Sequence, residues 1–167
     1  MSLIMPGTKV PLELAEVFVN FRTAELSTIA RDGTPVTVEV LPLWQPSLDR
    51  FLVTAAIGLP HKAYNARRNP HVSLLYSDPT ASGLDHPPIA LVQGDATVSD
   101  VTTWDDELAE CWRVVYTKQP NGLHAKGRVG RWLTDWYFIR VKIHITPTRI
   151  RWWPNANQAT PPLEVVA

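Results

Sequence analysis

A strict alternation of residue types near the C-terminus constrains the fold of this chain more than any other feature of its sequence. The apolar residues Tyr137, Ile139, Val141, Ile143 and Ile145 alternate with Phe138, Arg140, Lys142 and His144. A period of two predicts a strand with one face in a core and one face in water. Residues 148–153 are expected to add a last strand.

A second signal is the pair Asp32-Gly33 between the strand-like segments 25–31 and 34–41. Such a pair favours the tight turn of a hairpin, so these segments are predicted to be antiparallel neighbours. Further strands are expected at 50–54, 71–77 and 89–98. In the last of these, Gly94 indicates a bulge or a close approach of another group to its backbone.

Helices are expected at 11–21, after Pro60, and from an N-cap at Ser99 or Asp100 to Tyr116. Six or seven mostly antiparallel strands with flanking helices predict a mainly β fold, a small barrel whose closure removes unpaired edges. With 167 residues and 18.7 kDa, residues 1–154 are expected to form one domain. Residues 155–167 show little periodicity and are expected to be a loosely ordered tail.

Composition excludes several classes of function. Sixteen Lys and Arg balance sixteen Asp and Glu, so no overall field attracts nucleic acid or a membrane surface. A barrel binding single-stranded nucleic acid through Arg140 and Lys142 is a further alternative, which this neutral balance disfavours. No run reaches the ~18 apolar residues of a membrane span, and residues 1–12 lack a signal-peptide pattern, so a cytoplasmic protein is expected.

Motifs for metal binding and hydrolysis are missing from the sequence. Its five histidines lack metal-ligand spacing, so no metal is expected, and the single Cys111 cannot form an intramolecular disulfide. Neither a nucleotide P-loop nor a nucleophile-elbow motif occurs. No catalytic side chain is identified, and any chemistry would have to come from a cofactor.

A short basic segment is the main candidate for binding. Pro60 and Pro70 delimit a helix of about ten residues that carries His61, Lys62, Arg67 and Arg68. Amide groups at the start of a helix favour anions, so a phosphate group is expected there. The alternative is that these cations only solvate a surface helix.

Several of these features occur in an order that resembles a known family. Asp32-Gly33-x-Pro35, a strand ending in Thr54, HKAYNARRNPHVSLL, and Gln93-Gly94 resemble the pyridoxamine 5'-phosphate oxidase-like family of FMN-binding split barrels, over residues 20–100. The resemblance implies a split β-barrel and a homodimer with the cofactor between subunits. It implies these cofactor-binding residues: Thr54, His61 and Lys62 at the phosphate, backbone groups of Glu39, Val40 and Leu41 at the flavin edge, and Asn65, Arg67 and Gln93.

The sequence departs from true pyridoxamine phosphate oxidases. Val38 and Leu43 stand where those enzymes carry an Arg and a Lys, and Pro60 replaces a serine, which argues against vitamin B6 oxidation. The resemblance then implies an oxidoreductase that moves a hydride to or from a small molecule, with FMN as cofactor. The alternatives are an F420-dependent reductase of the same fold and a non-catalytic flavin- or haem-binding sensor or stress protein.

Two more segments could contact a ligand. Trp44 follows the strand that the family places beside the flavin, so it is a candidate for the substrate side, with core packing as the alternative. The basic segment from Lys118 to Arg131 could cover an anionic ligand or be a solvated loop.

Overall fold

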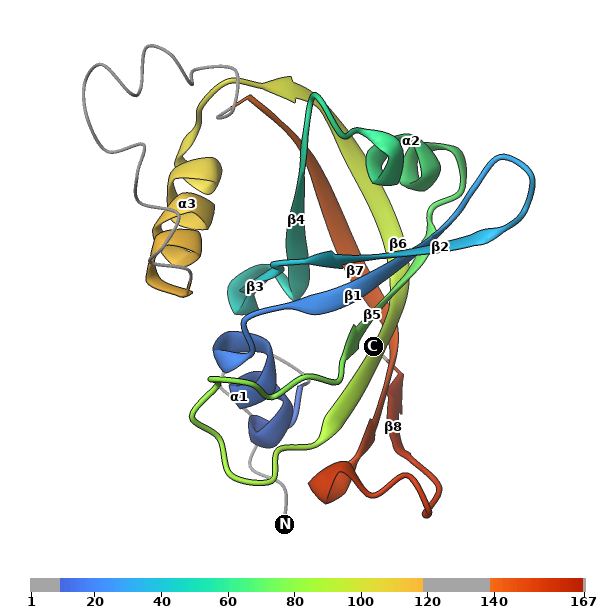
Figure 1. Cartoon of the computed structure of the whole chain (residues 1–167), viewed down its shortest axis with the longest axis vertical. Coiled ribbons are helices and arrows are strands. Elements are labelled where there is room, and N and C mark those ends of the chain that lie inside the picture. Colours follow the sequence, from blue (N-terminus) through green and yellow to red (C-terminus); the bar gives the residue numbers. More distant parts are fainter. Residues whose placement is uncertain (1–9, 119–138, 167) are drawn as a thin grey trace.

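The sheet of this protein is antiparallel throughout and strongly curved (Figure 1). The structure, a computed structural model, describes residues 10–118 and 139–166. Pairing runs in the order β2-β1-β5-β6-β7-β4-β3, with β8 added to β7. The strands are β1 (Ala24–Ile29), β2 (Pro35–Val40), β3 (Leu43–Gln45), β4 (Arg50–Ala56), β5 (His71–Tyr76), β6 (Ile89–Thr102), β7 (Arg140–Trp153) and β8 (Leu163–Val166). The predicted mainly β fold is confirmed, as is the hairpin of β1 and β2, where Gly33 has a φ of 87°.

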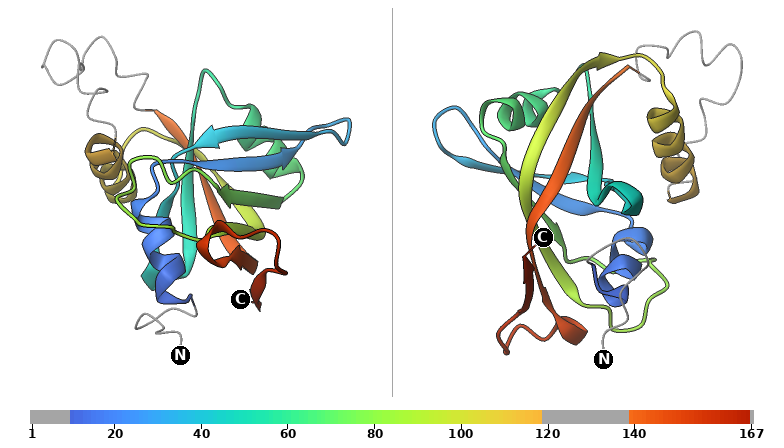
Figure 2. Two further views of the ribbon diagram at one scale, coloured as in Figure 1. Left: turned by 60° about the horizontal axis from the view of Figure 1, so that its bottom comes forward. Right: turned by 180° about the vertical axis from the view of Figure 1, so that it is seen from behind.

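Within the described residues, three α-helices accompany the sheet, and two short 3-10 turns, Pro46–Leu48 and Pro154–Ala156, follow β3 and β7. Helices α1 (Leu12–Asn20) and α2 (His61–Arg68) lie at opposite ends of the curved sheet, and α3 (Asp106–Lys118) lies outside it (Figures 1 and 2). No helix within residues 10–118 and 139–166 is long and apolar enough to cross a membrane.

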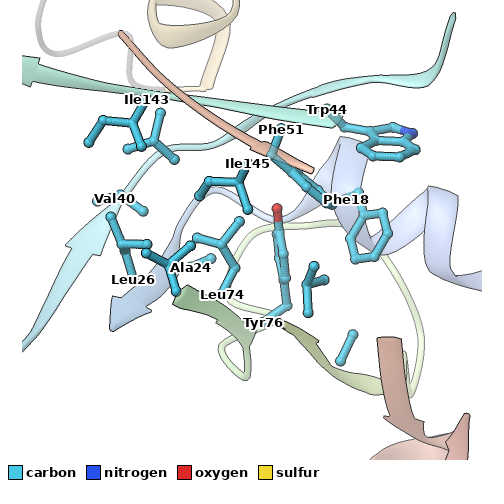
Figure 3. Close-up of a cluster of buried hydrophobic side chains, with 14 of the residues drawn as sticks. Phe18, Ala24, Leu26, Val40, Trp44, Phe51, Leu74, Tyr76, Ile143 and Ile145 are labelled. Atoms are coloured by element: carbon cyan, nitrogen blue, oxygen red, sulfur yellow. The ribbon is translucent and has the colours of Figure 1, made fainter. Parts of the chain in front are cut away.

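An aromatic cluster fills the end of the core that α1 covers (Figure 3). The ring of Phe18 from α1 lies 4.9 Å from that of Phe51 on β4 and 5.0 Å from that of Tyr76 on β5. Trp44 completes the cluster, with its ring 4.5 Å from that of Phe51. Tilted and edge-on contacts of this kind add to the stabilisation from burial alone. At the opposite end, α2 inserts only the small side chains Ala63 and Ala66 into the core.

Three expected boundaries differ from those observed. Residues 140–153 form one strand rather than two, and β6 continues to Thr102 because its last residues pair with the start of β7. Ser99 and Asp100 therefore lie in a strand and cap no helix. The N-terminal cap of α3 is instead Asp105, whose carboxylate accepts a hydrogen bond of 2.8 Å from the backbone N–H of Leu108.

The C-terminal segment differs from the loosely ordered tail that we expected. Residues Leu163–Val166 pair with Arg149–Trp152 of β7, and Glu164 forms an ion pair with Arg151 at 2.7 Å. Strand pairing satisfies backbone groups that a loose tail would leave to water. This strand was not predicted because its side chains are mostly exposed and show no alternation of apolar and polar residues.

Gly94 lies at a register shift between β6 and β7, in agreement with its predicted role. A Cβ atom at this position would lie 2.3 Å from the carbonyl oxygen of Thr146. Only glycine allows the two backbones to approach this closely.

We therefore expect Gly94→Ala to lower the free energy of unfolding by about 1–3 kcal/mol, because the added methyl group overpacks a backbone contact. Chemical denaturation monitored by circular dichroism measures this change. Gly58→Ala is the matched control, since no atom lies within 4 Å of its added Cβ. Equal stability of the two variants would contradict this explanation of Gly94.

Candidate phosphate-binding site

The end of β4, the start of β7 and the start of α2 meet at one corner of the molecule. In the β4–β7 register Thr54 lies opposite Lys142 and Ala56 lies opposite Arg140. Residues opposite one another, or two positions apart, share a face of a sheet. Thr54 and Arg140 therefore lie on the same outer face, and α2 begins after the short connection 57–60.

Lys62 is a half-buried cation at the start of α2. Burial lowers the pKa of its ammonium group, and the positive charge of Arg140 lowers that pKa further. Within the described residues Lys62 forms no ion pair with a carboxylate. No side chain caps the start of α2, so its first-turn amides also lack a side-chain acceptor. An anion at this position would be favoured by both groups.

Arg140 is the residue at this corner that sequence reasoning missed. Its surface is only 6% exposed, and its guanidinium carbon lies 4.9 Å from the centroid of the Trp112 ring on α3. Arginine commonly stacks on an aromatic face in this way. The alternation of residues 137–145 could show that Arg140 belongs to the polar face of a strand. The register against β4 and the position of α3 are long-range features that no local pattern encodes.

Thr54 is half-buried and its side chain interacts with the thiol of Cys111 on α3. Burial raises the pKa of that thiol to about 11 despite the opposing charge of Arg140. Cys111 is thus protonated at neutral pH and serves as a packing residue beside Leu43 and Leu52.

Helix α3 is held against the sheet by the half-buried carboxylate of Glu107. Glu107, with a side chain 17% exposed, accepts hydrogen bonds of 2.9 Å from both Gln45 and Arg50. It also lies 2.9 Å from the ammonium of Lys142 and from the imidazole Nε2 of His144. Burial opposes its ionisation, but the hydrogen bonds of Lys142, Gln45 and His144 outweigh burial and lower the pKa of Glu107 to about 2.

The Glu107 cluster corrects one expectation. The alternating strand was expected to have one face in water, but α3 covers the part of that face that carries Lys142 and His144. Lys142 also donates a hydrogen bond of 2.6 Å to Asp105. Its charge is therefore neutralised within the fold, which removes it from the nucleic-acid surface considered above.

Solved structures with the same architecture come from several kinds of protein. A putative pyridoxamine 5'-phosphate oxidase from Listeria innocua is 18% identical over 84% of this chain and 94% of its own, with a TM-score of 0.52. A protein described as an F420 reductase is 20% identical over 81% of this chain and 94% of its own, with a TM-score of 0.55. A heme binding protein from Mycobacterium smegmatis is 14% identical over 94% of this chain and 59% of its own, with a TM-score of 0.57.

The chain has the fold of the pyridoxamine 5'-phosphate oxidase-like split barrels. The predicted resemblance and the predicted split barrel are thereby confirmed at the level of fold. No protein-family model matches the sequence, and no curated protein matches it significantly.

Within this split barrel, α2 carries the other predicted residues of the basic helix. His61 is exposed at its first position. The amide of Asn65 donates a hydrogen bond of 3.1 Å to the hydroxyl of Thr28 on β1 and accepts one from Arg68, so Asn65 fastens α2 to the hairpin. Arg67 donates a hydrogen bond of 2.7 Å to the carbonyl oxygen of Ser99. These contacts give both Asn65 and Arg67 a structural role.

Gln93 lies in a different part of the split barrel. It lines an outer groove of about 480 Å³ that also contains Ser73, His71, Asp95 and Arg149. Arg149, which pairs with Gln93, is seven residues from Lys142, which pairs with Thr54. At about 3.3 Å per residue, the two positions are separated by roughly 23 Å along β7. One chain therefore does not bring Gln93 together with Lys62.

The remaining predicted residues lie on β2 and in the core. Val40 is buried, whereas Glu39 is exposed and Leu41 is half-buried. Within the described residues, β2 pairs only with β1, so backbone groups on its other edge are available to a ligand. Trp44 is 6% exposed and packs in the aromatic cluster, which is the core alternative that we considered.

Two sequence features lie largely outside the described residues. Of the basic segment 118–131, only Lys118 is described. It donates a hydrogen bond of 2.6 Å to the carbonyl oxygen of Phe21. Residues 10–118 and 139–166 contain no group of three or more His, Cys, Asp or Glu side chains that could hold a metal ion.

The half-buried, hydrogen-bonded carboxylate of Glu107 predicts a specific loss of stability in acid. A carboxylate whose folded pKa is depressed contributes stability that is present above its unfolded pKa and is lost as the pH falls toward its folded pKa. For Glu107 this window runs from 4.5 down to about 2. Glu107→Gln should lower the free energy of unfolding by about 1–3 kcal/mol at pH 7. Its deficit relative to the unsubstituted protein should shrink as the pH falls through that window.

Denaturant unfolding at a series of pH values measures this difference. Glu110→Gln, at an exposed carboxylate on the same helix, is the control and should change stability little. A Glu107→Gln deficit that stays constant across the acid range would show that the carboxylate charge is not what holds α3.

Proposed function

We propose that this protein binds an FMN-type cofactor through the corner formed by Thr54, Lys62 and the start of α2, and that it is an oxidoreductase. The half-buried position of Lys62 supports this most directly. Lys62 forms no ion pair within the described residues, and the charge of Arg140 disfavours its protonated form. Such a group is stabilised by a bound anion. The hydroxyl of Thr54, an ammonium group and helix amides form a donor set that suits a phosphate.

When bound, the flavin would supply the hydride chemistry. Lys62 and His61 would hold the phosphate, with Thr54 donating its hydroxyl to it. Backbone groups of Glu39, Val40 and Leu41, on the edge of β2 that no described strand occupies, would orient the ring. No side chain is proposed as a general acid or base.

F420 is the closest alternative as cofactor, because one structure with this fold is described as an F420 reductase. A non-catalytic binder of flavin or haem is a second alternative, because another is described as a heme binding protein. In the described part of this chain, His144 is bound to Glu107, His71 to Asp95, and His86 lies 3.6 Å from Asp85, which leaves the exposed His61 as the better haem ligand.

We further propose that the protein is a homodimer. The roughly 23 Å between the surroundings of Gln93 and of Thr54 fits a site completed by the groove of a second subunit. Sedimentation of the purified protein should give twice the mass of one chain, and a monomer that retains cofactor would contradict this arrangement.

The cofactor proposal is tested by purifying the protein from a host that makes FMN, F420 and haem. The absorption spectrum and the mass of the released chromophore should identify FMN. A deazaflavin or a Soret band would support the corresponding alternative. A colourless protein that takes up none of the three on titration would overturn the proposed function.

Lys62→Ala should weaken FMN binding roughly 10- to 100-fold, the usual effect of losing one charge-assisted hydrogen bond, while the fold stays intact. Equilibrium titration with FMN and thermal unfolding measure the two properties. Arg68→Ala removes the same charge from the far end of α2 and is the matched control. If the two variants lose FMN affinity equally, Lys62 has no particular role at the phosphate.

A further inference from the structure

We infer that Thr28 and Asn65 are positioning residues, and that the hydrogen bond between them sets the spacing between the start of α2 and the edge of β2. These two elements carry the phosphate end and the ring end of the FMN site proposed above, on which this inference rests. Neither residue needs to contact the cofactor. The resemblance does not single out Thr28, and it implies a cofactor contact, rather than this role, for Asn65.

Thr28 places a hydroxyl group inside the molecule. Alternate residues of β1 are buried, and this row consists of Ala24, Leu26 and Thr28. Thr28 is 1% exposed and is one of two buried polar or charged residues in the described part of the chain. Burying a hydroxyl is unfavourable unless it is hydrogen-bonded, so an apolar residue would be the simpler end to this row. The partners of the hydroxyl therefore indicate its role.

The hydroxyl of Thr28 joins α2 to both strands of the β1–β2 hairpin. It accepts a hydrogen bond of 3.1 Å from the amide nitrogen of Asn65 on α2. It also donates a longer one of 3.4 Å to the carbonyl oxygen of Val36, its cross-strand partner on β2. The amide oxygen of Asn65 accepts a hydrogen bond from Arg68 at the exposed surface, where water can replace this partner more readily than it can replace the buried Thr28.

The two sides of this link carry the two ends of the proposed site. Lys62 and Asn65 are three residues apart on α2 and so share a face of the helix. On the hairpin, β2 continues from Val36 to Val40, where backbone groups are proposed to orient the flavin. At about 3.3 Å per residue, this continuation spans roughly 13 Å. The bond between Asn65 and Thr28 thus connects the phosphate end to the ring end through side chains.

Helix α2 has little apolar contact that could hold it in place instead. Its buried side chains are those of Ala63 and Ala66, which are small, so hydrogen bonds account for a larger share of its attachment. A ligand with two ends binds more tightly than either end alone when both parts of its site are held at the spacing that it needs. Loosening α2 from the hairpin should therefore weaken a ligand that spans both parts and spare ligands that occupy one.

The test compares FMN with riboflavin, which lacks the phosphate, and with inorganic phosphate, which lacks the ring. Quenching of flavin fluorescence gives the dissociation constants of the flavins, and competition against FMN gives that of phosphate. Thr28→Val should weaken FMN binding roughly 3- to 10-fold, the usual effect of losing one hydrogen bond, and leave riboflavin and phosphate binding unchanged. Asn65→Leu should act in the same way. Thr28→Ser keeps the hydroxyl and should restore most of the FMN affinity.

Thr37→Val is the matched control. The hydroxyls of Thr37 and Ser27 form a hydrogen bond of 2.8 Å between the same two strands. Ser27 precedes Thr28, so this bond lies on the opposite face of the hairpin and does not reach α2. The control variant should leave all three affinities unchanged.

Hydrogen exchange of the ligand-free proteins measures the link without any cofactor. The amides of α2 should exchange roughly 3- to 10-fold faster in Thr28→Val than in the unsubstituted protein, whereas those of β5 should not change. Unchanged exchange in α2, unchanged FMN affinity, or a loss of riboflavin or phosphate affinity equal to that of FMN would overturn this inference and leave the FMN proposal intact. If the unsubstituted protein binds neither flavin, the proposed function fails and this inference falls with it.

Discussion

The ionised carboxylate of Glu107 is the contact on which the candidate site depends. It joins the first turn of α3 to side chains from three strands. These are Gln45 of β3, Arg50 of β4, and Lys142 and His144 of β7. One turn later the same helix places Cys111 against Thr54 and Trp112 against Arg140. A partly buried charge is costly unless its partners are present, so this network admits few alternative positions for α3. The orientation of Arg140 follows from a cluster that does not itself contact the proposed phosphate.

The parts of the fold that could be predicted from the sequence are those encoded by neighbouring residues. The Asp32-Gly33 turn, the alternation that became β7, and the proline-bounded helix α2 all depend on local conformational preferences. The role of Gly94 was also visible, because a glycine within a strand has few explanations. The boundary between β6 and α3 was misplaced because pairing with β7 extends β6 past Ser99 and Asp100, which locally favour a cap.

The candidate site was harder to predict, because Arg140 and Lys62 are separated by 78 positions in the sequence. Arg140 lies beside Thr54 only through the β4–β7 register, which no local pattern encodes. The same limitation affected Trp44. Its place after β2 suggested a ligand contact, whereas its burial against Phe51 depends on how α1 covers the core. Arg140 was missed and Trp44 was wrongly favoured, but the cause is the same. Packing between distant elements decides which polar or aromatic side chains face a ligand.

Leu43 lies at the contact between the sheet and α3, where a charged side chain would be unfavourable. Leu43, which the resemblance aligns with a cation of true pyridoxamine phosphate oxidases, is buried on β3 and packs with Leu52 and with Cys111 of α3. A lysine there would place an unpaired charge between sheet and helix, at a cost of several kcal/mol, or would displace α3. Displacing α3 would in turn release Trp112 from Arg140. Leu43 and Arg140 are therefore linked through one helix, so a change in the packing beneath α3 would also disturb the proposed phosphate corner.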